Sequence, residues 1–591
     1  MKTKQLILLT LLLVGGQLFA QEVVVKSGSI VMSGSVNLVL DDMSLTNEAT
    51  VDGSDGVLVL QPFSAKRLVT TSSDITLDGL TLSGAGGTAR LEGGLDVNDL
   101  TINANHILEV SETSGFTLNT SLTSSGDLTV ASGGSLIIKP AVPSVGNVTL
   151  SRTTTFDKNT GKYSVVGSPV ESSSFYSLGT NAQSWIFEYA ESTAYGTNGV
   201  DRFQSPTESI MTPGKGYFSA YTGDENGSIT FYGVPNYKNL QYAVTRTDNA
   251  SDPSEVEGFN LLSNPFTSPV SFSQFVTTNT SVLEEETIWI WDDIASDAGG
   301  GDATQDYITV SNLGNTDSRG GRLSDWDGTI NVAQGFFVKA ASNGNITFNH
   351  AMKTHDGNDD ASFFRTMNEE VERYWISIAD ESGTLGSNTL IGFKSDATND
   401  FDKQYDASKF GTSFSVYSLL EDRKLAIQAL SESWVDGADD QVIPLGYYAP
   451  SKGGFTMSLQ RSSYPSGIPL YLNDHLNGTS VNITEEAYSF QSQAGSYNDR
   501  FSLSLAPLRA ESILGLKSHQ LDIHAYGVAG AVKVKSQQTG ELALWTLEGK
   551  RVAEQSMSIG EMEIKVPAKG LYLLTVQTRE GNATYKIMVE N

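Results

Sequence analysis

A run of eight residues returns after twenty residues near the N-terminus, and this short period constrains the fold more than any other feature of the chain. Residues 75–82 read Ile-Thr-Leu-Asp-Gly-Leu-Thr-Leu, and residues 95–102 read Leu-Asp-Val-Asn-Asp-Leu-Thr-Ile, with the apolar positions in step. A repeat this short cannot bury its own apolar face, and it becomes stable only when copies stack on one another. We therefore expect residues 22–140 to form a β-solenoid-like repeat region.

The repeat pattern resembles the parallel β-helix segments of bacterial surface adhesins and also those of polysaccharide lyases. A lyase would need a cluster of charged side chains along one row of strands. The acidic residues of this region are instead scattered among the predicted turns, at Asp96, Asp99, Glu109 and Glu112. The adhesin-like, structural interpretation is therefore preferred.

A second, longer duplication occupies residues 141–355. Four blocks occur twice in the same order: residues 163–169, 185–189, 213–220 and 228–231 align with residues 259–265, 289–293, 332–339 and 345–348. Four matching blocks in one order predict a duplicated β module. The blocks are similar to a module found in many proteins exported by the type IX secretion system, and no chemistry follows from that similarity.

Large aromatic residues in the duplicated module allow two interpretations. They could form flat surfaces on which sugar rings stack, or they could fill a core. Their alternation with other residues along presumed strands favours burial of large apolar surfaces, and thus the core. The residues concerned are Trp185, Tyr189, Trp289, Trp291 and Trp326.

Strand-like runs over residues 363–507 predict a further antiparallel β-sandwich. One segment of this region gathers four carboxylates, at Asp396, Asp400, Asp402 and Asp406. Oxygen ligands of this kind suit Ca²⁺, but the segment lacks the glycine and the closing glutamate of a helix-loop-helix calcium loop. A solvated acidic loop is the preferred interpretation, and Ca²⁺ is the one cofactor that the sequence suggests.

The final segment, residues 521–591, differs in charge from the rest of the chain. It contains eight Lys or Arg and eight Asp or Glu, so the net charge of −30 lies entirely in the residues before it. Apolar residues alternate with polar ones along it, which predicts strands with one buried face. Glycine-containing pairs supply the turns between these strands.

This final segment resembles the type A C-terminal sorting domain of type IX secretion cargo, through the Gly-x-Tyr element at Gly570 and Tyr572 and the terminal strand with Lys586. The resemblance implies an immunoglobulin-like β-sandwich that the type IX machinery reads during passage across the outer membrane. Gly570, Tyr572 and Lys586 are then the expected signal residues. One departure is that residues 523–527 contain no proline, where such domains commonly carry an aromatic-Pro-Asn-Pro stretch.

Residues 1–20 have the order of a secretory signal peptide. Lys2 and Lys4 precede an apolar run from Leu6 to Val14, and a cut is expected after Ala20. The run is too short to cross a bilayer of about 30 Å as a helix. We therefore expect a mature chain without a transmembrane segment, located outside the cell or on its outer surface.

Composition excludes several classes of function. The chain contains no cysteine, so thiol chemistry is impossible. Its charge of −30 argues against binding to nucleic acid, which requires basic surface. No nucleophile elbow, zinc motif or phosphate loop is present, and His350 and His355 lack a third ligand nearby. Paired carboxylates on distant strands leave no local pattern, so glycoside hydrolysis stays open.

These observations predict an all-β protein with solenoid-like repeats, β-sandwich modules and a C-terminal sorting domain. We expect a non-enzymatic, structural or adhesin-like protein that is exported by the type IX machinery and has a possible surface glycan as ligand. The alternative is a secreted carbohydrate-binding or polysaccharide-degrading protein.

Overall fold

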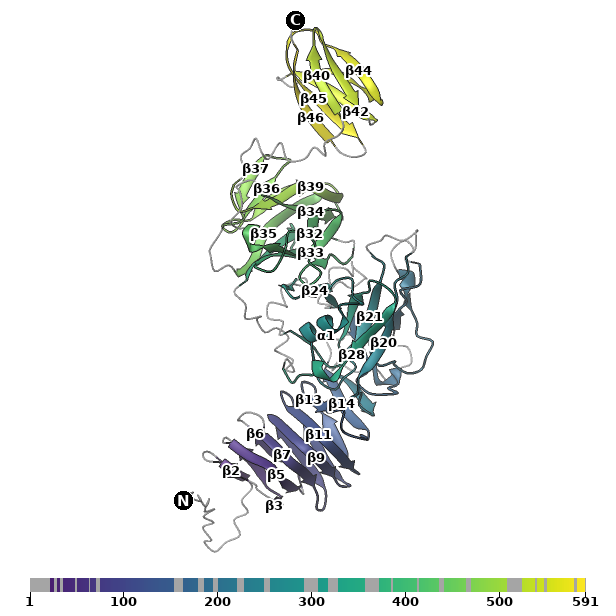
Figure 1. Cartoon of the computed structure of the whole chain (residues 1–591), viewed down its shortest axis with the longest axis vertical. Helices are drawn as coiled ribbons and strands as arrows, with labels where there is room; N and C mark the ends of the chain where they lie inside the picture. The colour runs from purple at the N-terminus through teal and green to yellow at the C-terminus, as the bar shows by residue number, and fades with distance from the viewer. Residues whose placement is uncertain are drawn as a thin grey trace. The chain divides into compact units, whose positions relative to one another are not determined.

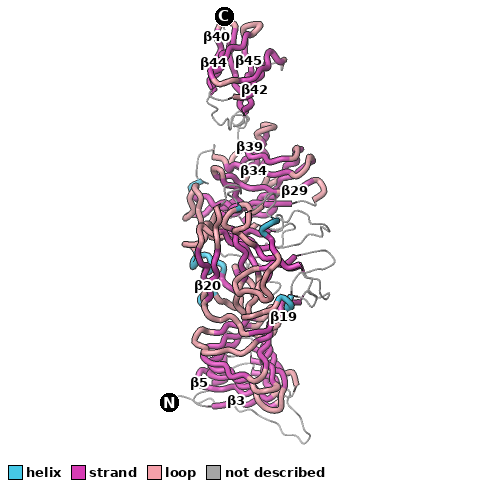
Figure 2. The backbone as a smooth tube through the Cα atoms, turned by 90° about the vertical axis from the view of Figure 1, so that its right-hand side faces the viewer, coloured by secondary structure: helices cyan, strands magenta, loops and turns pink. Residues whose placement is uncertain are grey.

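In a computed structural model of the chain, strands dominate and the helices are few and short (Figures 1 and 2). The longest described helix is α1 (Phe272–Asn279), and no helix in the described ranges is long and apolar enough to cross a membrane. The structure describes residues 22–25, 29–31, 36–47, 50–62, 64–70, 75–153, 163–178, 185–194, 200–220, 228–248, 256–291, 307–316, 328–356, 371–383, 386–411, 414–434, 441–463, 469–507, 523–536, 539–546, 550–578 and 582–589. The predicted signal peptide lies outside these ranges.

The chain divides into two compact units. The first comprises Met1–Val435, Tyr447–Ser466 and Ser489–Gly495, and the second comprises Asp436–Gly446, Gly467–Tyr488 and Ser496–Asn591. Both are built from β-sheets.

The first unit begins with the predicted solenoid, which consists of two sheets whose neighbouring strands run parallel (Figure 1). One sheet contains β1 (Glu22–Val25), β4 (Ser44–Asn47), β6 (Lys66–Thr70), β8 (Gly87–Glu92), β10 (His106–Val110), β12 (Asp127–Val130) and β14 (Val148–Thr153). The other contains β2 (Ser29–Val31), β3 (Val36–Asp41), β5 (Thr50–Gln61), β7 (Ile75–Leu82), β9 (Gly94–Ile102), β11 (Gly115–Ser124) and β13 (Ser135–Ile138).

The strand register confirms the β-solenoid-like prediction for this stretch. Strands β7 and β9 pair in parallel with Ile75 opposite Leu95 and Leu82 opposite Ile102, which is the alignment that the twenty-residue repeat predicts. The apolar residues of both sheets point into one core, where Leu80, Leu100 and Leu118 are fully buried. Stacking thus supplies the burial that a single repeat lacks.

The last turn of the solenoid is capped by the duplicated module. Strand β14 pairs in the antiparallel direction with β19 (Ser228–Gly233), which ends the run of parallel strands. At the edge of the other sheet, the backbone N–H of Leu136 donates to the carbonyl oxygen of Thr267 (2.8 Å), and the Thr267 hydroxyl donates to the carbonyl oxygen of Leu136 (2.7 Å). The solenoid core continues into the module as far as Ala333.

The duplicated module contains two small sheets with the same strand order. The first contains β15 (Tyr163–Val166), β18 (Tyr217–Ala220), β16 (Trp185–Tyr189) and β17 (Phe203–Gln204), and the second contains β21 (Phe259–Ser263), β27 (Gly335–Lys339), β23 (Ile288–Trp291), β24 (Tyr307–Ser311) and β25 (Gly314–Asn315). Each sheet has a companion antiparallel pair, β14 with β19 in the first copy and β20 (Leu240–Val244) with β28 (Gly344–Phe348) in the second. A further short pair joins β22 (Val270–Ser271) to β26 (Thr329–Ile330).

Short 3-10 helices complete this region and the next. They are η1 (Phe175–Leu178), η2 (Val200–Arg202), η5 (His350–Met352) and η6 (Glu432–Trp434).

The third region of the first unit is mainly antiparallel, with one parallel pair that differs from the expectation. Its strands are β29 (Glu372–Asp380), β30 (Gly386–Lys394), β31 (Ala407–Ser408), β32 (Ser415–Leu420), β33 (Arg423–Ser431) and β35 (Gly453–Ser463). Strands β30 and β33 pair in parallel, with Leu390 opposite Ile427. Parallel neighbours need a crossover connection, and the acidic segment at 396–406 lies in this crossover.

Two strands near the third region lie partly in each unit, and one lies almost wholly in the second. They are β34 (Ile443–Ala449), β38 (Tyr488–Ser492) and β39 (Gly495–Ser504). In the second unit, β36 (Tyr471–Asp474) pairs with β37 (Thr479–Asn482) and with β39.

The C-terminal part of the second unit is formed by two sheets around one core. The sheets are β40 (Ile523–Val528), β41 (Ala531–Ser536) and β44 (Gly560–Lys565), and β43 (Arg551–Met557), β42 (Gly540–Thr546), β45 (Gly570–Thr578) and β46 (Asn582–Val589). Every member of their hydrophobic core comes from residues 523–589, with Val532 from one sheet and Leu544 from the other fully buried. This C-terminal sandwich therefore has a core of its own.

Candidate functional site

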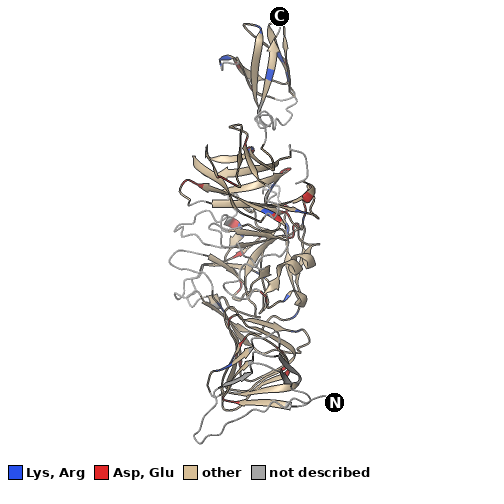
Figure 3. Ribbon diagram, turned by 90° about the vertical axis from the view of Figure 1, so that its left-hand side faces the viewer, with Lys and Arg blue, Asp and Glu red and all other residues tan. Residues whose placement is uncertain are grey.

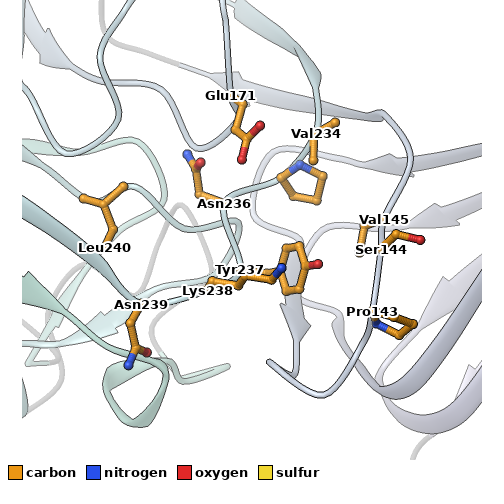
Figure 4. A pocket seen from close by; sticks show the side chains of 11 residues that line it. Pro143, Ser144, Val145, Glu171, Val234, Asn236, Tyr237, Lys238, Asn239 and Leu240 are labelled. Carbon is orange, nitrogen blue, oxygen red and sulfur yellow. The ribbon is translucent and has the colours of Figure 1, made fainter.

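An open pocket lies where the end of the solenoid meets the first copy of the module (Figure 4). Its volume is about 320 Å³, near the lower end of the range for small-molecule sites. Three segments line it: residues 143–145 between β13 and β14, Glu171 in the turn after β15, and residues 234–240, which run from the end of β19 to the first residue of β20. The duplication places these segments together, because β14 and β19 are paired strands of one repeat copy.

Hydrogen bonds hold the floor of the pocket in place. The backbone N–H of Glu171 donates to the carbonyl oxygen of Val234 (2.7 Å), and the Tyr237 hydroxyl donates to the carbonyl oxygen of Val142 (3.2 Å). The ammonium group of Lys353 donates to the carbonyl oxygen of Tyr237 (2.7 Å). Burial lowers the pKa of Lys353 to about 7, since the charged form loses water there.

Polar side chains surround this floor. Glu171, Lys238 and Ser144 are exposed, and among the described residues none of the three has a hydrogen bond or an ion pair from its side chain. Lys238 extends over the ring of Tyr237, 5.2 Å from its centroid. Figure 4 shows the carboxylate of Glu171 and the amide of Asn236 directed toward each other. The site thus offers an acid, a base, an amide and a hydroxyl to one small ligand.

Tyr232 lies on β19, two residues before the pocket residue Val234, and the sequence analysis missed it. This residue is 62% exposed, the highest value for an aromatic residue among the described large apolar residues. Its hydroxyl accepts a hydrogen bond from the amide of Asn147 (2.9 Å). Tyr232 and Asn147 lie two residues from the pocket residues Val234 and Val145. The available signal was its outward position in the alternation of β19, next to buried Phe231.

The first two predicted calcium ligands lie at the start of the crossover. Asp396 accepts a hydrogen bond from the Tyr405 hydroxyl (2.5 Å) and forms an ion pair with Lys394 (3.0 Å). Asp400 is exposed. The hydrogen bond from Tyr405 is the largest contribution that lowers the pKa of Asp396.

The other two predicted ligands accept hydrogen bonds from backbone N–H groups of the loop and of β33. The carboxylate of Asp402 accepts from the backbone N–H of Thr398 (2.5 Å). Asp406 is fully buried and accepts from the backbone N–H groups of Asp402 (2.7 Å) and Ala429 (2.6 Å). Within the described ranges, no three His, Asp or Glu side chains converge as a metal site would require. The structure therefore does not bring the four aspartates together.

Two acidic groups are buried where this crossover meets the second copy of the module. Burial raises the pKa of Asp406 to about 7 and also raises the pKa of Glu285, which is fully buried. One oxygen of Glu285 accepts from the backbone N–H of Ser408 (2.6 Å), and the other has no hydrogen-bond partner. The positive charge of Lys339 acts in the opposite direction and lowers the pKa of Glu285.

The three predicted signal residues lie on the closing hairpin of the C-terminal sandwich. Gly570 begins β45 with a φ of 153°, a positive value that favours glycine. Tyr572 is buried in the core and donates its hydroxyl to the carbonyl oxygen of Ala568 (2.6 Å). Lys586 is exposed on β46, opposite Leu573 of β45. The structure thus separates an exposed lysine from two residues with a structural role.

The two neighbouring histidines do not form a site. His355 lies between the hydroxyls of Thr117 (2.8 Å) and Ser135 (2.7 Å), on strands β11 and β13 of the solenoid. A Cβ on Gly115 would lie 2.8 Å from the His355 ring, so only glycine permits this approach. Burial lowers the pKa of His350 to about 4. Both residues belong to the joint between the solenoid and the module.

Aromatic residues of the module pack against one another. Trp289 is fully buried, as the core interpretation predicts, and its ring lies 4.9 Å from that of Phe259. Trp291 donates its indole N–H to the carbonyl oxygen of Tyr163 (2.9 Å). Trp326 and the side chain of Trp185 lie outside what the structure describes.

Comparison with known proteins gives one family. A family model described as Domain of unknown function (DUF8693) matches residues 89–505. The chain belongs to this family. The DUF8693 match runs from within the solenoid through the duplicated module and the third region, and it contains every residue that lines the pocket. The C-terminal sandwich lies beyond it.

Two further comparisons add no functional information. No curated protein matches the chain. Among solved structures, a "Biofilm associated protein - BSP domain" is similar at 8% sequence identity, over 75% of this chain and 92% of that chain, with a TM-score of 0.11. This score is too low to support an inference about the fold.

Proposed function

We propose that the chain is a non-enzymatic, β-rich protein that is exported by type IX secretion and acts at the cell surface or in the medium as a structural or adhesin-like scaffold. The observation that carries this proposal is the C-terminal sandwich, whose core uses residues 523–589 alone. A module with its own core can fold apart from the cargo before it. An export address needs this property, since the same machinery must read it on different cargo.

The scaffold role is supported by the continuity of the first unit. One hydrophobic core contains residues from Leu40 in the solenoid to Ala333 in the second copy of the module. Hydrogen bonds from Thr267 and His355 join the two parts. Charged positions of both signs are scattered along the described strands (Figure 3), which suits solubility outside the cell.

Deletion of residues 521–591 tests the export proposal. The truncated chain should accumulate in the periplasm, whereas the full chain should reach the surface or the medium. Cell fractionation with an antibody against residues 22–140 measures the distribution. Release of the truncated chain at the normal level would overturn the proposal.

Lys586 can be tested without disturbing the fold, because its side chain is exposed. Lys586→Glu should block export while circular dichroism and the melting temperature of the purified chain stay unchanged. Lys565→Glu is the matched control, since Lys565 is an exposed lysine on β44 of the same sandwich. Equal export of both variants would contradict the assignment of Lys586 to the export signal.

A secreted carbohydrate-binding protein is the second candidate function, and the pocket beside Tyr232 favours it. Glu171 is the one carboxylate among the described residues that line this pocket. Glycoside hydrolysis ordinarily uses two carboxylates, so the pocket supports binding and gives no support to cleavage.

A further inference from the structure

We propose that the pocket formed by residues 143–145, Glu171 and residues 234–240, together with the exposed ring of Tyr232, binds one sugar unit of an extracellular glycan. This inference rests on the second candidate function and assigns its site. It does not depend on the export route.

The ring of Tyr232 supplies an apolar platform. A sugar ring has a face of C–H groups that packs against an aromatic ring, and tyrosine combines such a ring with a polar tip. Tyr232 lies opposite Thr149 in the antiparallel pair of β19 and β14, which fixes its backbone. The hydrogen bond from Asn147 to its hydroxyl restricts the side chain as well (2.9 Å). The exposed ring is therefore held in place before a ligand arrives.

The polar groups of the pocket match the hydroxyl groups of a sugar. Each hydroxyl both donates and accepts a hydrogen bond. Glu171 supplies acceptors, Lys238 supplies donors, and the Ser144 hydroxyl can do either. Asn236 is buried, and its amide nitrogen donates to the carbonyl oxygen of Ser168 (3.5 Å), so its amide oxygen is the group that it offers. The charges of Glu171 and Lys238 cancel, which favours a neutral polyhydroxylated ligand over a phosphate or another anion.

Backbone hydrogen bonds fix the floor of the pocket. Pro235 forms a β-bridge with Val170, and the backbone N–H of Asn236 donates to the carbonyl oxygen of Pro169 (3.0 Å). Tyr237 is buried beneath the pocket as part of the continuous core. A preformed site loses little conformational entropy on binding, which increases affinity.

The rim leaves room for a longer chain. Pro143, Ser144, Lys238 and Asn239 are exposed around the pocket. A sugar in the pocket can therefore continue into further units outside it. This geometry fits a terminal or internal unit of a polysaccharide.

The test uses the purified full chain on a glycan array, followed by titration calorimetry with the best soluble oligosaccharide. Wild type should bind a defined set of neutral glycans. Tyr232→Ala should weaken binding about tenfold, the order that one aromatic contact can supply. The double variant with Tyr232→Ala and Glu171→Gln should bind more weakly than Tyr232→Ala alone.

Two control variants match these changes away from the pocket. Tyr526→Ala removes another exposed tyrosine, in the C-terminal sandwich, and Glu208→Gln neutralises another exposed acid. Both should bind like wild type, and all four variants should keep the wild-type melting temperature because the altered side chains are exposed.

The outcomes separate the site from the function. Failure of the wild-type chain to bind any glycan would overturn both the site and the second candidate function. Glycan binding that Tyr232→Ala and Glu171→Gln leave unchanged would overturn the site alone. Binding of a free amino acid or peptide in place of sugars, lost in both variants, would overturn the assignment to sugars.

Discussion

Single residues in the first unit show how burial, more than sequence neighbourhood, sets the chemistry of an acid. Asp402 and Asp406 lie four positions apart in one acidic segment. Asp402 is partly exposed, whereas Asp406 is fully buried and accepts the backbone N–H of Ala429. Desolvation disfavours the charged form, and it raises the pKa of Asp406 to about 7. The segment that suggested a calcium loop is thus partly interior.

Asp406 should make the stability of the chain depend on pH. Its folded pKa lies above its unfolded value, so the folded state binds a proton that the unfolded state releases between about pH 4 and 7. The free energy of unfolding should therefore fall as the pH rises through this range. Asp406→Asn removes this contribution. Urea unfolding at pH 5 and pH 8 should show a larger advantage of wild type over the variant at pH 5.

That experiment should compare the free energy of unfolding of wild type with that of the variant at each pH. Lys353 and His350 have lowered pKa values, so their own contributions to the pH dependence of stability have the opposite sign and cancel in this difference. A difference that stays constant or grows from pH 5 to pH 8 would contradict the burial of a protonated Asp406.

Trp289 should contribute more to stability than any exposed aromatic residue. It is fully buried against Phe259, and its indole N–H donates to the carbonyl oxygen of Ser408 (3.3 Å). Trp289→Ala should lower the free energy of unfolding by about 3–5 kcal/mol, as expected for a large side chain lost from a core. Tyr232→Ala is the control and should change it by less than about 0.5 kcal/mol. Urea denaturation measures both.

At the scale of elements, the solenoid is completed by residues from elsewhere in the chain. The edge strand β13 is covered by Thr267 and by His355, which bonds Ser135 of that strand. An uncovered sheet edge tends to pair with other chains. The duplicated module therefore caps the end of the solenoid.

His355→Ala should loosen this cap. The change removes both hydrogen bonds of the ring and leaves the Thr117 and Ser135 hydroxyls without them, at a cost of about 1–3 kcal/mol. Hydrogen exchange should become faster in β11 and β13 and stay unchanged in β7. His475→Ala is the control, because His475 bonds Ser502 in the second unit. Equal protection of β13 in both variants would argue against the cap.

At the scale of the whole molecule, separate cores predict separate unfolding. The core of the C-terminal sandwich contains no residue before 523, while the solenoid and the module share another. Differential scanning calorimetry should therefore show at least two transitions. Tyr572→Ala removes a buried ring and the hydrogen bond to Ala568, so it should lower the free energy of unfolding of the sandwich by about 3–5 kcal/mol. The transition of the sandwich should move to a lower temperature, and the other transition should stay unchanged. A single transition that shifts as a whole would contradict separate cores.

Local periodicity was sufficient for the solenoid, because the apolar positions at Leu80 and Leu100 specify both the buried face and the register of the next turn. The blocks of the duplication fall in two sheets that have the same strand order. Only the tertiary structure decided the parallel pairing of β30 with β33, the contact of His355 with the solenoid, the burial of Asp406 and the pocket beside Tyr232. A repeating pattern shows which face of a strand is buried, but it carries no information about which distant segment covers that face.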